Sequence, residues 1–253
     1  MKKQTMLLTW FLAICGFIVG SYGLWDRLAN GHANAAYGSY VPWGLWVAEY
    51  TYFIGLSAGA FLLSTLVYVF NMRRLEKVGK LALLTAIVTL FAAMFLIFLD
   101  LGHPERFWKL IVNTNFHSIM GWMIWLYSAY FLLLLAEFWF ALRGDLVSWS
   151  SKSAIARFLT FGRTDGSDAA LAADRRTLRI LGSIGVPLAV AFHGGVGALF
   201  GVLGSRPYWN SGLTPIVFLV GALLSGGALL TFVTAVFDPN RGTEEHRELV
   251  LFL

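Results

Sequence analysis

The chain has 253 residues, of which 58% are hydrophobic and only 13% are charged, and its mean hydropathy is +0.68. This composition excludes a soluble globular domain of this length and predicts an integral membrane protein. The net charge of +5 follows from the sidedness of the loops in such a protein, so it does not indicate nucleic-acid binding.

Six long apolar stretches each approach the roughly 20 residues that a helix needs to cross a bilayer. None alternates with a period of two, so a transmembrane β-barrel is not expected. In the second stretch, Gly55 and Gly59 have the spacing of a close helix–helix contact. We predict an all-α, polytopic transmembrane helix bundle, one membrane domain over residues 1–253. The expected helices cover residues 5–25, 44–70, 81–100, 118–142, 180–203 and 213–237, with an inner loop over 143–179 and the start of a possible seventh helix from about residue 246.

The positive charges predict the orientation of this bundle, because inner loops retain lysine and arginine. With the N-terminus inside, 15 of the 19 lysines and arginines lie on the inner side. The outer side keeps only Arg27, Arg106, Lys109 and Arg206. The N-terminus is therefore expected in the cytoplasm. The first apolar stretch is nearer the length of a membrane helix than that of a signal peptide, so we expect no cleavage.

Five titratable residues fall in the outer half of the membrane or at its outer rim in this topology. They are Glu49, Asp100, His103, His117 and His193. Acidic residues inside membrane helices are costly and are candidates for function. Two alternatives stay open: Glu49 could form a hydrogen bond to a neighbouring helix, and His193 could have the same packing role.

The gathering of acids and histidines predicts a quinone site. A quinone reacts with two electrons and two protons, so its site needs an apolar slot, hydrogen-bond partners for the oxygens and titratable groups leading to water. One heme held by His193 and His117 is an alternative, but their depths match poorly and no heme is expected. Cys15 is the single cysteine, so this chain alone cannot hold a cysteine-ligated iron–sulfur cluster. No metal site is predicted.

Four stretches, taken in order and spacing, carry a resemblance to a known family. They are Gly44 to Ala60, Leu99 to Trp108, which reads LDLGHPERFW, Ser118 to Trp122, and Arg206 to Pro215. On these residues the chain resembles the polysulfide reductase membrane subunit family (PsrC/NrfD type). The family usually has eight or more spans in two four-helix bundles, whereas six are counted here.

The resemblance implies a membrane subunit of a respiratory oxidoreductase in the prokaryotic cytoplasmic membrane, surrounded by lipid. Such a subunit binds menaquinone or another quinone near its outer face. It exchanges electrons with an outer iron–sulfur (ferredoxin-like) subunit, and through it with a catalytic subunit or multiheme cytochrome. The second to fifth expected helices would form the four-helix bundle that carries the quinone.

The resemblance and the outer position of the titratable groups also imply roles for individual residues. Asp100 corresponds to the family's acidic residue at the quinone pocket, while the transfer to His193 is weaker. Glu137 is a candidate for a proton path, and the alternative is that its side chain extends to the cytoplasmic surface. The expected catalytic residues are Asp100, Glu49, His117 and His193, the quinone-binding residues Tyr50, Trp122, Trp46 and His103, and the partner-facing residues Pro42, Arg106, Trp108, Arg206, Trp209 and Asn210.

Two other functions compete with this interpretation. A proton-coupled transporter would use the same acids, but it predicts inverted repeats and broken helices near the midplane, and no convincing repeat is seen. A purely structural anchor would use the polar residues for packing. Substitutions would then disturb assembly and leave redox activity per assembled complex unchanged.

Overall fold

The computed structural model describes residues 3–38, 40–41, 43–72, 75–238 and 241–253, and this part of the chain contains helices and no strand. Six of its helices are long and apolar enough to cross a membrane. The all-α, six-span prediction is therefore confirmed. The helices are α1 (Lys3–Asn30), α2 (Leu45–Tyr68), α3 (Glu76–Asp100), η2 (Pro104–Arg106), α4 (Lys109–Val112), α5 (Ile119–Trp149), α6 (Ala154–Leu159), α7 (Asp168–Gly201), α8 (Thr214–Phe237) and α9 (Glu244–Phe252).

Most of the predicted loop over 143–179 is helical. Helix α5 continues to Trp149, α6 follows, and α7 already begins at Asp168. The Ser167 side chain accepts a hydrogen bond from the backbone N–H of Ala170, and Asp168 lies in the first turn. A capping hydroxyl and an acidic first turn both stabilise a helix start. Hydropathy marks only the apolar part of such a helix, so the prediction missed its polar extension.

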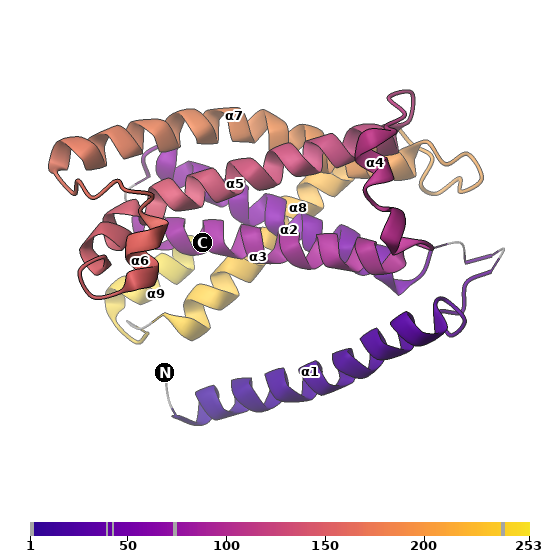
Figure 1. Cartoon of the computed structure of the whole chain (residues 1–253), viewed down its shortest axis with the longest axis horizontal. Coiled ribbons are helices and arrows are strands. Elements are labelled where there is room, and N and C mark those ends of the chain that lie inside the picture. Colours follow the sequence, from indigo (N-terminus) through magenta and orange to yellow (C-terminus); the bar gives the residue numbers. More distant parts are fainter. Residues whose placement is uncertain (1–2, 39, 42, 73–74, 239–240) are drawn as a thin grey trace.

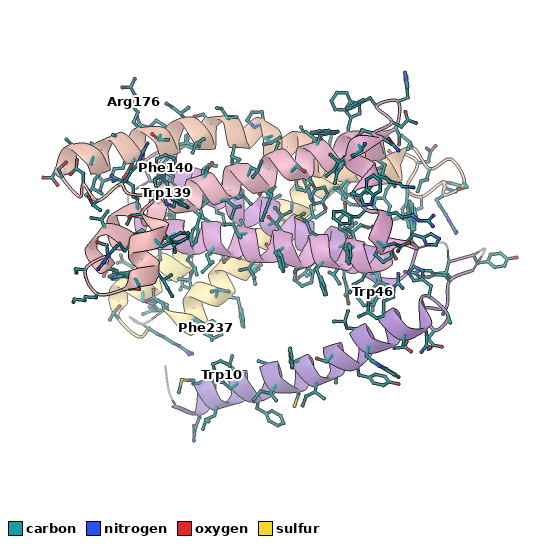
Figure 2. All side chains as sticks on the ribbon, in the orientation of Figure 1. Trp10, Trp46, Trp139, Phe140, Arg176 and Phe237 are labelled. Atoms are coloured by element: carbon teal, nitrogen blue, oxygen red, sulfur yellow. The ribbon has the colours of Figure 1, made fainter. Side chains whose placement is uncertain are left out.

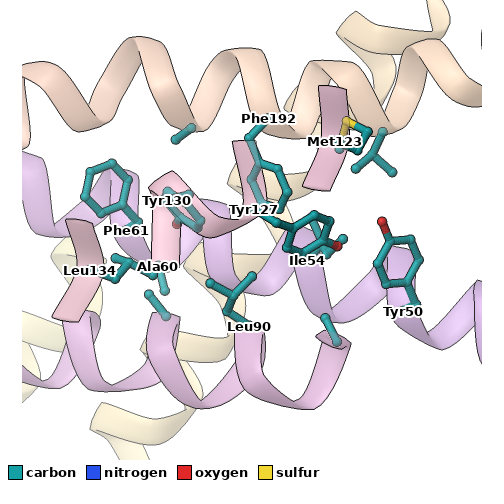
Figure 3. Packing of buried hydrophobic residues seen from close by; sticks show 14 of the residues in the cluster. Tyr50, Ile54, Ala60, Phe61, Leu90, Met123, Tyr127, Tyr130, Leu134 and Phe192 are labelled. Carbon is teal, nitrogen blue, oxygen red and sulfur yellow. The ribbon is translucent and has the colours of Figure 1, made fainter. Parts of the chain in front are cut away.

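Helices α2, α3, α5 and α7 form a closed four-helix bundle, in which α2 and α5 each contact both α3 and α7 (Figure 1). This is the bundle expected for the second to fifth spans. Its core contains the fully buried side chains of Ile54, Phe61, Leu90, Tyr130 and Phe192 (Figure 3). Below, the Asp100 end is the end of the bundle at which α3 finishes, and the Arg143 end is the opposite one.

Helix α8 packs on the outside of this bundle, against α2 and α7. The contact with α2 is made backbone to backbone at Gly59 and Gly226. A Cβ atom placed on Gly59 would lie 2.1 Å from the carbonyl oxygen of Ala222, and one on Gly226 would lie 2.5 Å from the Cα of Gly59. Only glycine fits at either position. The close packing predicted for Gly59 is therefore confirmed.

Helix α1 lies apart from the bundle (Figure 1), and the most apolar part of its length is exposed. The Arg27 side chain, itself buried, connects it to α3. Its Nε donates to the carbonyl of Leu99 and its Nη2 to the carbonyl of Leu101, both at 2.6 Å. These carbonyls lie at the C-terminal end of α3, where a helix leaves acceptors unpaired and favours a cation.

Replacing Arg27 with alanine should release α1. Each hydrogen bond from a charged donor contributes roughly 1.5–3 kcal/mol, and both would be lost. The native Cys15 on α1 is exposed, and spin labels on Cys15 and on an introduced Phe91→Cys of α3 would report the distance between the two helices. We expect the distance distribution to broaden in Arg27→Ala and to stay narrow in a control, Arg106→Ala, at an exposed site. Equal widths would contradict the tether.

Candidate functional site

Asp100, the residue predicted to be catalytic at the end of α3, accepts a hydrogen bond from the Tyr37 hydroxyl on its Oδ1. Partial burial raises the pKa of Tyr37 to about 12, and the contact with Asp100 adds to that shift. The usual tyrosine pKa is 10.0, so this bond stabilises the fold fully below about pH 10 and is lost as the pH rises towards 12. Sequence reasoning missed Tyr37, which lies in a loop without a periodic pattern.

The segment between α3 and α5 exposes several predicted residues. His103 Nδ1 lies 3.2 Å from Glu105 Oε1, with both side chains largely in solvent. A hydrogen bond from its own backbone N–H, and then His103 and Arg106, lower the pKa of Glu105. Trp108 is half exposed, and Lys109 lies 5.7 Å from the centre of its ring. This surface is polar, aromatic and exposed.

Three other residues predicted to face a partner make contacts that hold the α7–α8 loop. The Arg206 Nη2 donates to the carbonyl of Tyr40, and the Asn210 side chain donates to that of Gly201, both at 2.8 Å. The Trp209 ring stacks against Trp43, with 6.4 Å between ring centres. Pro42 lies outside the described residues.

A tyrosine core, made of Tyr50, Tyr127 and Tyr130, lies inside the bundle (Figure 3). The rings of Tyr50 and Tyr127 stack at 6.0 Å, and Tyr127 contacts Phe192 edge-on at 4.4 Å. Tyr130 Oη lies 3.5 Å from Ser57 Oγ. The Tyr127 hydroxyl is buried. Tyr50 was predicted as a quinone-binding residue, whereas a tyrosine in a membrane helix, such as Tyr127 or Tyr130, is expected to be a packing or interface residue.

His193 of α7 lies in a different place, at a groove of about 390 Å³ between α2, α7 and α8. Its Nε2 lies 2.9 Å from the carbonyl oxygen of Phe218. A carbonyl only accepts, so Nε2 carries the hydrogen, and in the neutral ring Nδ1 is then an acceptor. That Nδ1 is buried and has no partner among the described residues. The remaining polar lining includes Thr51 and Ser225.

Glu49 does not reach this groove. It is not among the residues that line the groove, which on α2 are Thr51, Tyr52 and Gly55. His117 is exposed, and its backbone N–H binds Asn115 Oδ1 at 3.0 Å. Trp122 is also exposed.

Trp46 of α2 is half-buried. The predicted residues thus separate into the rim around Asp100, the tyrosine core and the His193 groove.

Glu137 is almost completely buried, at 1% exposure, so the alternative that it extends to the surface is wrong. Its Oε1 has no hydrogen-bond partner within the described ranges. Six residues further along α5, Arg143 donates from Nε to Asp174 of α7 in a buried ion pair. Its Nη1 also donates to the carbonyl of Asp165 at 2.9 Å. Sequence reasoning missed this pair because it counted both residues as loop.

The comparison with known families matches residues 33–252 to the one described as "Polysulphide reductase, NrfD". This chain belongs to the NrfD family. The match includes α2 to α8, so the bundle, the tyrosine core and the His193 groove all lie in the family's shared region. It also confirms the resemblance seen in the sequence.

Among curated NrfD relatives, a selenate reductase subunit of Mesobacillus selenatarsenatis is 46% identical over 247 residues, which cover 94% of this chain and 57% of that protein. The integral membrane subunit of an Hdr-like menaquinol oxidoreductase of Archaeoglobus fulgidus is 31% identical, over 75% of this chain and 41% of that protein. The integral membrane subunit of menaquinone reductase of Nitratidesulfovibrio vulgaris is 25% identical, over 88% of this chain and 52% of that protein. The chain spans about half the length of the curated relatives it matches.

Proposed function

We propose that this chain acts in a respiratory oxidoreductase complex as a membrane subunit that binds a quinone in the His193 groove and exchanges electrons with an iron–sulfur subunit. The observation that carries the proposal is the Nδ1 of His193, which is buried beside an apolar groove without a partner among the described residues. The names of two relatives support it, because one is a menaquinol oxidoreductase subunit and the other a menaquinone reductase subunit.

The groove fits a quinone in size and lining. Small-molecule sites usually measure roughly 300–1,000 Å³ and combine an apolar wall with a few polar groups, and this groove has about 390 Å³. Val217 and Gly221 line it and are exposed on the outer surface of α8. The groove is therefore open on this side of α8, from which a lipid-soluble molecule would enter.

The chemistry proposed for His193 follows from its tautomer. With Nε2–H held by the Phe218 carbonyl, Nδ1 can accept a hydrogen bond, and then a proton, from a hydroxyl of a bound quinol. Once protonated, the same nitrogen can donate to a quinone carbonyl. Asp100 and Tyr37 would pass protons to water at the rim, and Glu137 would extend a path towards the Arg143 end.

The partner would dock on the Asp100 end. The segment with His103, Arg106 and Trp108 is exposed there, and it combines cations, an acid and aromatic rings. Arg206, Trp209 and Asn210 would support this surface from below by fixing the α7–α8 loop. A catalytic subunit or multiheme cytochrome would connect through the iron–sulfur subunit.

The test is quinone-dependent electron transfer by the purified complex, followed through the iron–sulfur signals of the partner with and without a quinone-site inhibitor. Gly221→Leu should fill the groove, because nothing lies within 4 Å of a Cβ at Gly221. His193→Leu should remove the proton acceptor. We expect each to lower turnover at least tenfold while the complex still assembles, and Asp100→Asn to abolish it.

The matched control is Val220→Leu, on an exposed neighbouring position of α8 that is not among the residues lining the groove. It should keep full turnover and inhibitor sensitivity. Normal turnover in both Gly221→Leu and His193→Leu would refute the groove, and a b-type heme spectrum in the purified subunit would refute the expectation that no heme is needed. Loss of assembly in all variants would favour the anchor alternative.

A further inference from the structure

The segment over residues 149–163, called here the α6 segment, exposes large apolar side chains and buries small or polar ones. Ile155, Phe158 and Phe161 are 73%, 75% and 68% exposed, whereas Ala156 and Thr160 are 5% and 0% exposed. A helix that contacts water shows the reverse pattern. Exposed apolar side chains of this size indicate that something other than water covers this face.

The same segment carries three cations and no acid. Lys152, Arg157 and Arg163 are all exposed, and none of them pairs with a carboxylate of the described residues. The Arg157 Nε donates to the carbonyl of Ser150 at 3.4 Å. The Arg163 guanidinium lies 5.8 Å from the centre of the Trp139 ring. A surface that is both apolar and cationic is complementary to an anionic lipid layer.

The position of the α6 segment along the bundle is consistent with a location at the membrane surface. Trp139 lies 20 residues after Ile119, where α5 begins, which at 1.5 Å per residue is about 30 Å, the thickness of the hydrocarbon. Helix α5 continues beyond that level to Trp149, and the chain then turns back. The Trp139 Nε1 donates to the carbonyl of Leu159 at 2.8 Å. The α6 segment is thus fastened at the level where a helix that starts at the outer surface would leave the hydrocarbon.

Aromatic packing fixes the exposed face at this level. Phe161 contacts both Trp139 and Phe158, with ring centres 6.0 and 6.2 Å apart, and Trp139 and Phe140 lie near the same end of the bundle as α6 in Figures 1 and 2. We infer that the α6 segment is an interfacial site for anionic phospholipid, with its aromatic residues at the acyl chains and its three cations on the headgroup phosphates.

The test uses the full chain with Cys15→Ser and an environment-sensitive fluorophore on Phe158→Cys, reconstituted into phosphatidylcholine vesicles. Chain-spin-labelled phosphatidylglycerol or phosphatidylcholine is then added at equal mole fractions. We expect both lipids to quench the fluorophore. One cation near an anionic membrane surface strengthens binding by about fivefold. Quenching by phosphatidylglycerol should therefore exceed quenching by phosphatidylcholine by at least that factor.

The double variant Arg157→Gln/Arg163→Gln removes two cations from the segment. It should lower the ratio of quenching by phosphatidylglycerol to quenching by phosphatidylcholine to nearly one, while the quenching by phosphatidylcholine remains. The matched control, Arg175→Gln/Arg176→Gln, removes two exposed charges from α7 and should keep the preference. Quenching by neither lipid would overturn the inference, since a protein surface or water would then cover the face. Equal quenching by both lipids, or equal loss in the control, would overturn it as well.

Discussion

Replacing Asp174 with alanine should lower the free energy of unfolding by about 3–5 kcal/mol, because it leaves the Arg143 guanidinium buried without its counter-ion. The side chains of Arg143 and Asp174 are only 4% and 9% exposed. A lone charge at such a site must be solvated by rearrangement of the extensions of α5 and α7. Unfolding in mixed micelles with increasing denaturing detergent would measure the change.

The chain offers a matched control for this pair. Lys80 and Asp145 also form an ion pair, at 2.6 Å, but with side chains 46% and 38% exposed. Lys80→Ala should therefore cost less than about 1 kcal/mol. The double variant Arg143→Met/Asp174→Leu should be more stable than Asp174→Ala, since it buries no unpaired charge. An equal loss in the free energy of unfolding in Asp174→Ala and Lys80→Ala would contradict the burial of the Arg143–Asp174 pair.

Replacing Gly226 with alanine should push α8 away from α2. The new methyl group would lie 2.5–2.6 Å from Gly59 and Ala60 backbone atoms, and backbone cannot rotate away as a side chain can. Forced overpacking of this kind costs typically about 1–3 kcal/mol. We also expect the hydrogen bond between His193 and the Phe218 carbonyl to lengthen, because Phe218 moves with α8. Histidine nitrogen NMR shifts in a selectively labelled sample would detect that change.

Gly227→Ala is the control for the second prediction, one residue further along α8. The nearest atom to its added methyl group would be Leu63 Cδ1 at 4.0 Å, so no clash arises. Alanine has a higher helix propensity than glycine by about 1 kcal/mol, and the control should be neutral or slightly stabilising. If the two alanine variants were equally stable, the contact at Gly59 would be looser than described.

The sequence predicts depth in the membrane well and direction around a helix poorly. Asp100, Tyr50 and His193 all lie towards the end of the bundle at which they were expected, because hydropathy fixes how far along a helix each residue sits. Whether a side chain faces the core, a groove or lipid depends on which neighbour packs against it. For that reason Glu49, expected in one pocket with His193, is not among the residues that line the His193 groove.

The missed features share a second cause, which is that they depend on pairing across long distances in the sequence. Arg143 pairs with Asp174 and Tyr37 with Asp100, and no periodic pattern within either segment signals these contacts. Gly59 is the opposite case. Its spacing from Gly55 indicates a close contact from local sequence alone, and only the identity of the partner helix had to come from the structure.

Because the Arg27 side chain attaches α1 near one end of the helix, a small tilt at that end moves the other end of α1 a long way. From Arg27 back to Lys3 the helix is about 36 Å long at 1.5 Å per residue. A tilt of about 10° at the attached end would move the free end by about 6 Å, more than half the 10–12 Å width of a helix with its side chains. Helices or lipids of different width could thus pack between α1 and the bundle without a change in the packing of the bundle itself.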